Sequence, residues 1–533
     1  MKSLSSILRS LPHADYNSRY YPWLVLGTTM IATFMAVLDA TIVTVALPNL
    51  MAAFGVPIDT IEWMLTAYLL VFGVMLPSSG WFADRFGYKK IFMLGLVLFT
   101  AGSFLCSIAW DIGFLMFFRI VQGLGAGVLM PVGMAIVTRE FPPQKRGIAL
   151  GFWSVSASAS VALGPTVGGF LIDKYSWHSI FDINVPIGIV GFILSQMILK
   201  EYRSKDVGRF DFVGFISLIF FLSGLLLGLS NGNASWNTGG WTSRFILSSF
   251  SISFLGFIVF IFNELITKRP LIEISLFKNY NFSLTNIVLF SFGVGLFGSN
   301  FLMPLYLQNA LGYTPFQTGL VFLPLGIALG LTGPVAGLIA DKVSAKYPPL
   351  IGLILLAYTF YQYSFLSLFS EKHQVVDPLY IRGIGMGLMF SPLTTLALSE
   401  IPNNKIAQAS GLINVIRQIG GSFGVALFGA VLSNRTELHM SQYGTGLQQH
   451  AEVLNMTQTN LSYYTTSFSG GLASEALQKS QAMIAQYTQQ QAFVSSINDV
   501  FLIAAVILIA SLVPGLMLHE HKKRESQDTA RAM

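Results

Sequence analysis

The sequence has few charged residues and a single cysteine. Asp, Glu, Lys and Arg make up 11% of the 533 residues, whereas soluble domains carry about 25%. This shortage argues against a water-soluble enzyme. Because Cys106 is the only cysteine, an intrachain disulfide and a cysteine-based metal cluster are excluded. The chain also lacks a Gly-x-x-x-x-Gly-Lys-Ser/Thr motif, so we do not expect it to hydrolyse ATP.

Apolar residues are abundant instead. They amount to 53% of the chain, and the mean hydropathy is +0.63. Such a composition is typical of a chain that lies mostly in lipid, where apolar runs of about 20 residues must form helices because lipid cannot satisfy free backbone polar groups. Fourteen runs are predicted to span the membrane: 22–47, 60–82, 90–109, 112–137, 147–171, 180–199, 212–230, 244–265, 283–306, 317–340, 348–369, 378–400, 405–431 and 498–518.

The basic residues are distributed unevenly between the loops. Most of the 31 Lys and Arg residues fall on the side of the two termini, whereas the loops near 48–59 and 307–316 have none. The positive-inside rule therefore predicts that both termini are cytoplasmic. Each basic cluster lies next to a span, so the net charge of +6 does not require a nucleic acid as partner.

A pattern recurs between the two halves of the chain. The segment Gly80–Arg85 is matched by Gly337–Lys342, about 257 residues later, and Arg119 and Arg382 precede similarly spaced glycines. Such a repeat predicts two six-helix halves with two helices inserted between them. The expected organisation is a cytoplasmic segment 1–21, an N-terminal six-helix bundle 22–199, the inserted helices with flanking loops 200–282, a C-terminal six-helix bundle 283–518 including a long outer loop 433–497, and a cytoplasmic tail 519–533.

Asp39 and Arg119 are ionisable residues deep inside predicted spans, where charge is costly and usually functional. Counted at 1.5 Å per residue, both lie about 11 Å below the outer surface. If their helices are neighbours, the two side chains share a layer, and Gln122 would hold the guanidinium in place. Two interpretations are open. The carboxyl is a proton carrier whose affinity changes with its solvation, or the pair is permanently ionised and joins two helices.

A second polar group lies in the span 405–431. Arg417 is flanked by Asn414 and Gln418, and such a cluster faces the protein interior or a cavity. It would contact an anionic substrate group, line a gate or belong to a buried structural network. Arg382 lies one turn inside its span and is expected to extend toward the surface. The candidate substrate-cavity residues are Phe34, Tyr68, Asn300, Phe301, Asn414 and Arg417.

Small residues leave the backbone of span 147–171 nearly bare, and Pro165 interrupts its hydrogen bonds. We expect close helix approach with a bend, which serves either rocking against a partner helix or tight static packing.

Four motifs match a known family. They are Leu38–Pro48 in the first span, Gly80–Lys90 after the second, Arg119–Gly123 in the fourth and Ser160–Gly169 in the fifth, where Ser160 stands in place of a customary Gly. In these motifs the chain resembles the fourteen-helix drug:proton antiporters of the EmrB/QacA type within the major facilitator superfamily.

The resemblance implies an all-α integral membrane protein of the major facilitator fold, with two six-helix bundles plus two inserted helices. It implies proton-coupled multidrug efflux of lipophilic or cationic compounds by alternating access across the bacterial inner membrane. A dedicated exporter of an endogenous amphiphile, such as a fatty acid or siderophore, is the alternative. We expect no metal and no cofactor besides the proton gradient, and the seven histidines, all outside the predicted spans, do not suggest an intramembrane enzyme.

The resemblance also assigns roles to residues. Proton coupling falls to Asp39, Arg119 and Gln122, the gating motif to Gly80, Asp84, Arg85, Gly87, Lys89 and Lys90, and the antiporter motif to Gly164, Pro165, Gly168 and Gly169. The outer segment 433–497 is expected to be a solvated loop, helical from Ala473 onward. It is where we would look for contact with a periplasmic adaptor, which serves EmrB-type pumps together with an outer-membrane channel, although relatives from single-membrane bacteria act alone.

Overall fold

The computed structural model describes residues 18–519, except 143–144, 205–206, 233, 235, 268–269, 343, 403–404 and 470–472. The regular elements in this part of the chain are helices. Their bounds are α2 Tyr21–Phe54, α3 Ile58–Phe86, α4 Tyr88–Ser107, α5 Ile112–Glu140, α6 Arg146–Lys174, α7 Ser179–Asp182, α8 Asn184–Ile198, α9 Phe212–Asn231, η2 Gly240–Thr242, α10 Arg244–Ile266, η3 Ile274–Lys278, α11 Tyr280–Asn309, α12 Pro315–Lys342, α13 Tyr347–Tyr363, α14 Lys372–Leu398, α15 Ile406–Gln449, α16 Ala451–Ser469, α17 Ala473–Ala510 and α18 Leu512–Leu516.

Most of these helices are built to cross a membrane. Among the described residues, 12 helices are long and apolar enough to do so. The two other predicted spans fall on α6, of 29 residues, and on α13, of 17 residues. The multi-pass character is therefore confirmed, whereas the count of fourteen spans stays a prediction. The predicted segments 1–21 and 519–533 lie almost wholly outside the described residues.

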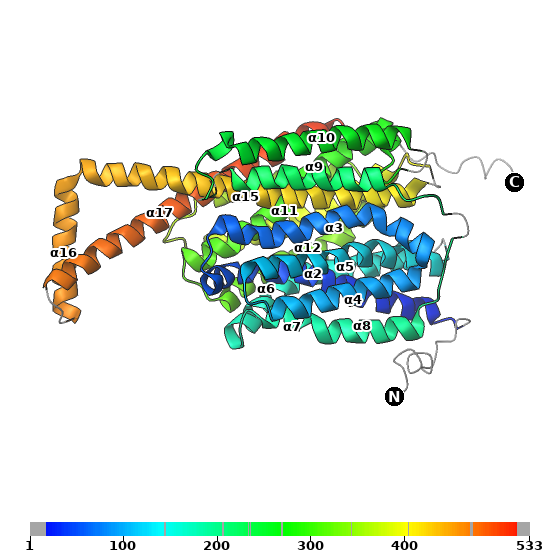
Figure 1. Ribbon diagram of the computed structural model, residues 1–533, viewed down its shortest axis with the longest axis horizontal. Helices are drawn as coiled ribbons and strands as arrows, with labels where there is room; N and C mark the ends of the chain where they lie inside the picture. Colours follow the sequence, from blue (N-terminus) through cyan, green and yellow to red (C-terminus); the bar gives the residue numbers. More distant parts are fainter. Residues whose placement is uncertain are drawn as a thin grey trace.

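The helices form two bundles. In the first, α2 packs on α6 and α8, and α5 packs on α3 and α4. In the second, α11 packs on α15, and α14 packs on α12 and α13. The inserted helices α9 and α10 pack on each other, and α9 also contacts α3 and α15 (Figure 1). The bounds expected for the two bundles and for the inserted helices stay a prediction.

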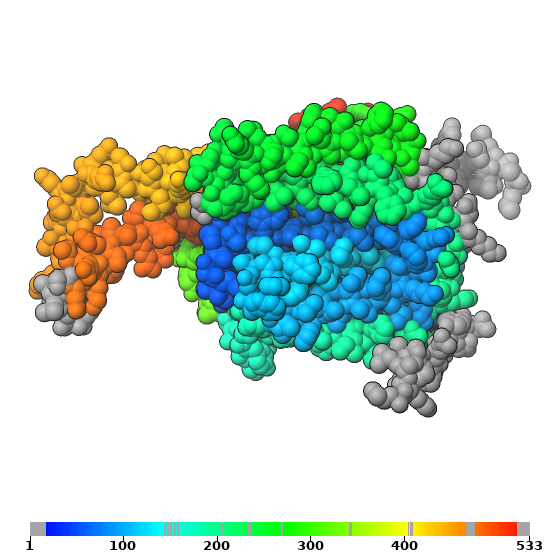
Figure 2. Space-filling model, in the orientation of Figure 1, coloured from blue at the N-terminus to red at the C-terminus, as the bar shows by residue number. Residues whose placement is uncertain are grey.

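A long helical hairpin extends from one end of the bundles. The structure continues α15 to Gln449 and begins α17 at Ala473, with α16 between them (Figures 1 and 2). The Tyr443 hydroxyl lies 2.8 Å from that of Ser495, and His439 lies 3.0 Å from Asp499, so the two long helices are tied together at their base. The expectation of a solvated loop was wrong for the described residues before Ala473, where α15 continues to Gln449 and α16 follows it. Helix from Ala473 onward is confirmed.

The two bundles meet along a seam formed by α6 with α12, α3 with α15, and α2 with α11. We call the end with the hairpin the hairpin side, and the opposite end, where α2 begins, the terminal side (Figure 1). Near the hairpin side, Gln308 donates to the Val45 carbonyl at 2.8 Å, and Asn49 donates to Gln308 at 3.3 Å. There too the Phe316 N–H donates to Asp173 at 3.1 Å. The seam is closed on the hairpin side.

Candidate functional site

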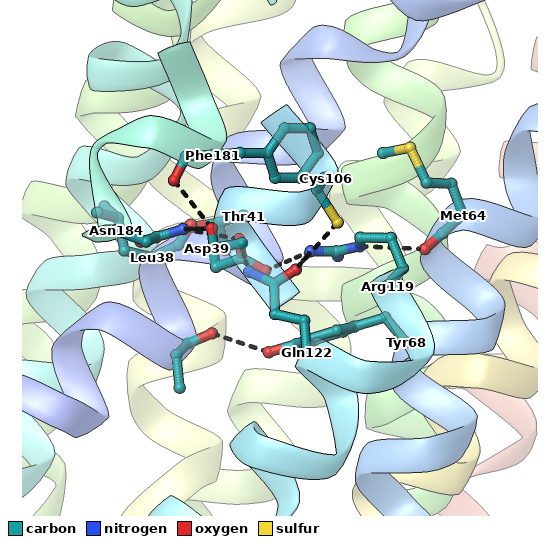
Figure 3. Close-up of polar contacts among 12 residues, drawn as sticks. Leu38, Asp39, Thr41, Met64, Tyr68, Cys106, Arg119, Gln122, Phe181 and Asn184 are labelled. Carbon is teal, nitrogen blue, oxygen red and sulfur yellow. Dashed lines mark hydrogen bonds and ion pairs between the residues drawn. The ribbon is translucent and has the colours of Figure 1, made fainter. Parts of the chain in front are cut away.

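Asp39 and Arg119 meet in the interior of the first bundle. The Arg119 Nη1 lies 2.5 Å from Oδ2 of Asp39, and both side chains are fully buried (Figure 3). Gln122, one turn further along α5, joins them, because its Oε1 accepts from Arg119 at 2.7 Å and its Nε2 donates to Asp39 Oδ1 at 2.8 Å. The prediction that α2 and α5 place the two charges in one layer is confirmed.

Asn184 completes the shell around the carboxylate. It begins α8, and its side-chain amide donates to Oδ1 of Asp39 and to the Ser103 hydroxyl, both at 3.0 Å. Ser103 in turn donates to the Phe181 carbonyl at 2.9 Å. Two helices besides α2, namely α5 and α8, thus donate directly to one carboxylate, and α4 supports Asn184 through Ser103.

The charge pair lies in apolar surroundings. The Arg119 guanidinium stacks on the Tyr68 ring at 4.1 Å, and Tyr68 donates its hydroxyl to the Ala36 carbonyl at 3.3 Å. The Cys106 thiol lies 4.0 Å from the Gln122 amide oxygen. Stacking on an aromatic face and hydrogen bonding to every carboxylate oxygen stabilise the ionised pair without water. A proton can reach Asp39 only after this packing has loosened.

Arg382 holds the matching place in the second bundle and has a different partner. Its Nη2 donates to the Asn300 amide oxygen at 2.6 Å, and its side chain is buried. Two further guanidinium nitrogens, Nε and Nη1, have no hydrogen-bond partner among the described residues. The expectation that Arg382 extends toward the surface was wrong, because α11 covers it and supplies Asn300.

The candidate cavity residues fall into two groups. Tyr68 and Phe301 are fully buried, and Asn300 is engaged by Arg382, so these three do not face an open space in this conformation. Phe34, Asn414 and Arg417 are partly exposed. The Arg417 guanidinium donates to Asn414 at 2.9 Å and lies 4.4 Å from the ring of Phe390, which is 40% exposed.

Asp84 of the gating motif is the centre of a polar cluster on the terminal side. It accepts from the Ser204 hydroxyl at 2.6 Å and from the Tyr88 hydroxyl at 2.9 Å. The base that approaches it is Arg139 at the end of α5, at 3.7 Å, a residue that the motif itself does not include. Asp84 therefore joins the end of α3 to α5 and to the loop before α9.

The other gating residues have separate surroundings. Gly87 has φ +109° and forms the turn between α3 and α4, whereas Gly80 lies inside α3 and makes no turn. Lys89 donates from Nζ to the Gln196 carbonyl at 2.6 Å. Arg85 and Lys90 are exposed.

The antiporter motif lies at contacts of α6 with both bundles. Gly164 and Gly168 face Thr41 and Ile42 of α2, where a Cβ on either glycine would collide. Gly169 lies against Pro315, and Thr166 donates to the Gly319 carbonyl of α12 at 2.9 Å. The helix remains continuous through Pro165. Close helix approach is therefore confirmed.

Three residues of these sites escaped the sequence prediction. Asn184 lies within the predicted span 180–199 and Arg139 in a basic loop, and neither was assigned a role from the sequence. Glu62 was not predicted as a site residue because it lies at the start of the predicted span 60–82. Its side chain is nevertheless 0% exposed. The sequence signal that could have identified Glu62 is the presence of an acidic residue inside an apolar run.

Two bundles of membrane-length helices that meet along a closed seam, with a charge pair buried inside one of them, define a multi-pass membrane transporter. The chain belongs to the Major Facilitator Superfamily, whose family model matches residues 29–425.

Its relatives match over nearly the whole chain. The multidrug export protein EmrB of Haemophilus influenzae is 32% identical, with 91% of this chain and 93% of the relative covered. The probable multidrug resistance protein EmrY of Escherichia coli is 30% identical, with 91% and 93% covered. The uncharacterized MFS-type transporter YhcA of Bacillus subtilis is 31% identical, with 94% of each chain covered.

Solved structures share the fold at low identity. A bacterial homologue of the human lysosomal transporter Spinster, in an inward-facing and unoccupied conformation, superposes with a TM-score of 0.63 at 15% identity, covering 95% of this chain and 100% of the other. A POT family transporter in complex with 5-aminolevulinic acid gives 0.61 at 15% identity, covering 96% and 100%.

Proposed function

We propose that this protein is a proton-coupled multidrug efflux antiporter that exports lipophilic or cationic compounds by alternating access. The observation that carries the proposal is the buried Asp39–Arg119 pair, with Gln122 and Asn184 completing its hydrogen bonds. Relatives that bear the names of multidrug export and multidrug resistance proteins support the substrate class.

The pair can act as a proton switch. With the seam closed on the hairpin side, Asp39 is ionised and fully hydrogen-bonded. The proposal requires that rocking of the bundles also moves α2 relative to α5 and α8 within the first bundle. The donors then separate from the carboxylate, and water reaches it from the hairpin side. A carboxyl that has lost its cation and lies in a partly apolar environment binds a proton more readily. Protonation then frees Arg119, and a return to the closed packing expels the proton.

The protein is proposed to lie in the bacterial inner membrane with both termini cytoplasmic. In this orientation the hairpin formed by α15, α16 and α17 extends away from the cytoplasm. A periplasmic adaptor, joined to an outer-membrane channel, would find its contact surface there. The hairpin stands clear of the bundles, which supports this assignment (Figure 2).

One observation favours a second candidate function. Arg417 is partly exposed and donates a hydrogen bond to the neutral Asn414. A guanidinium in such a place would bind the carboxylate of an amphiphile such as a fatty acid or siderophore. Efflux measured side by side for a fluorescent dye cation and a fluorescent fatty acid separates the two functions, since only the fatty-acid exporter loses transport with Arg417→Gln.

The test of proton coupling is Asp39→Asn in inverted membrane vesicles. The unmodified protein should transport the dye cation faster when a pH gradient is imposed, and Asp39→Asn should abolish that acceleration. Glu437→Gln is the matched control, because it removes an exposed carboxyl on α15 and should leave coupling intact. Retained acceleration in the Asp39→Asn protein would remove Asp39 from the mechanism.

A further inference from the structure

Glu62 is a buried acid on the seam between the bundles. It lies in the first turns of α3, near the hairpin side, and its side chain is 0% exposed. Neither carboxyl oxygen has a hydrogen-bond partner among the described residues. This distinguishes it from Asp39, whose oxygens accept hydrogen bonds from Arg119, Gln122 and Asn184.

Two helices from other parts of the fold face Glu62. From the second bundle, α15 presents Gly429, where a Cβ would collide with Oε2 of Glu62. The inserted helix α9 presents the Ser230 hydroxyl to Glu62, near enough to act on its carboxyl, although the two groups form no hydrogen bond of full geometry in the described part of the chain. The other acidic group that acts on Glu62 is Asp59, one turn earlier on α3. No Lys, Arg or His of the described residues forms an ion pair with Glu62.

An ionised Glu62 would be costly in this place. Burying an isolated charge in an apolar environment without a counterion costs far more free energy than burying a neutral polar group. The closed seam therefore requires the neutral acid. When α3 and α15 separate on the hairpin side, water reaches the carboxyl and ionisation becomes favourable.

We propose that Glu62 is a second proton-binding site, which takes a proton from the hairpin-side solution and thereby allows the seam to close. The step is an association of one proton with one carboxylate, and it is reversed when the seam opens. Because Glu62 lies near the hairpin side, the proton returns to the solution from which it came. The site controls the gate and does not add to the protons transported. This inference rests on the proposed alternating access but not on the role of Asp39.

The test measures seam closure as a function of pH. Spin labels at Ala53→Cys and Asn309→Cys, which are exposed positions at the hairpin-side ends of α2 and α11, report the distance between the bundles. The background carries Asp39→Asn, so that Asp39 cannot supply the response. We expect the ratio of closed to open protein to rise as pH falls, by up to about tenfold per pH unit for one proton.

Three variants decide the outcome. Glu62→Gln and Glu62→Ala should both keep the seam closed at every pH and so remove the pH dependence of seam closure. Two variants are used so that the test still stands if one of them does not fold. Asp59→Asn, which removes the neighbouring carboxyl, should retain the response. An unchanged pH response in either Glu62 variant overturns the proposal. The vesicle test of Asp39→Asn is independent, so failure of proton coupling and failure of the Glu62 site are distinguishable.

Discussion

Two arginines occupy corresponding places in the two halves of the chain but have partners of different charge. Arg119 in the first bundle faces the carboxylate of Asp39, whereas Arg382 in the second faces the neutral amide of Asn300. Both arginines are buried. The repeat therefore preserves a cation in each half but supplies a titratable partner in only one of them.

The difference has an energetic consequence. In a buried ion pair, attraction and hydrogen bonds offset much of the free energy lost by removing the two charges from water. A buried cation with a neutral partner has no such compensation from an opposite charge. The first half is thus stabilised by a contact that protonation would break. Among the described residues the second half has no equivalent buried ion pair, so its interior should respond little to pH.

The largest effect is expected from removing the cation of the first half. Arg119→Ala leaves Asp39 as an uncompensated buried charge and should lower the free energy of unfolding by about 3–5 kcal/mol. Arg382→Ala, the matched change, removes a cation without a carboxylate and should cost less. Equilibrium unfolding of both variants in detergent micelles measures the difference. Equal losses of unfolding free energy in the Arg119→Ala and Arg382→Ala proteins would contradict the expected difference between the two halves.

An intermediate effect is expected from giving the second half a carboxylate. Asn300→Asp places a charge-assisted partner 2.6 Å from the Arg382 guanidinium, and such bonds contribute about 1.5–3 kcal/mol. The variant should unfold at a higher temperature at neutral pH, and the gain should fade as the pH is lowered. Asn286→Asp is the control on the same helix, because Asn286 is buried without an ion pair and its variant should be destabilised. A gain from both changes would show that the effect has nothing to do with Arg382.

The smallest effect concerns the partly exposed ion pairs on the terminal side. In the first half Arg139 approaches Asp84, and in the second Lys405 pairs with Glu273. The hydrogen bond from Lys405 lowers the pKa of Glu273 below its ordinary value of 4.5. Its contribution is therefore present above pH 4.5 and is lost as the pH falls through the lowered pKa.

Glu273→Gln should accordingly cost only about 0.2–1 kcal/mol at neutral pH, since solvent screens such pairs. The difference from the unmodified protein should vanish in acid. Thermal unfolding followed at several pH values measures it, with the exposed Glu371→Gln as control. A cost that persists at low pH would show that Glu273 acts through something other than its charge.

Local signals were sufficient to predict the helices and the central pair. Apolar runs of membrane length locate the spans, because lipid leaves the backbone no alternative to helix. Depth along a helix follows from a fixed rise per residue, and so Asp39 and Arg119 could be assigned to one layer before their distance was known.

The rest depends on contacts between segments far apart in the sequence. Arg382 is buried because α11 passes over it, and no feature of its own span indicates this. Glu62 is buried because Gly429, more than three hundred residues later, lets α15 approach. The hairpin extends as helix beyond the membrane, where hydropathy carries no information about structure.

The place of α9 has a consequence for the route of a hydrophobic compound. This helix contacts both α3 and α15 (Figure 1). It therefore covers the flank where α3 and α15 would separate when the two bundles rock. A molecule dissolved among the lipid tails meets a wall on that flank. In the proposed transport cycle, entry from the lipid would therefore use the flank where α6 meets α12, and the inserted helices make the two flanks unequal.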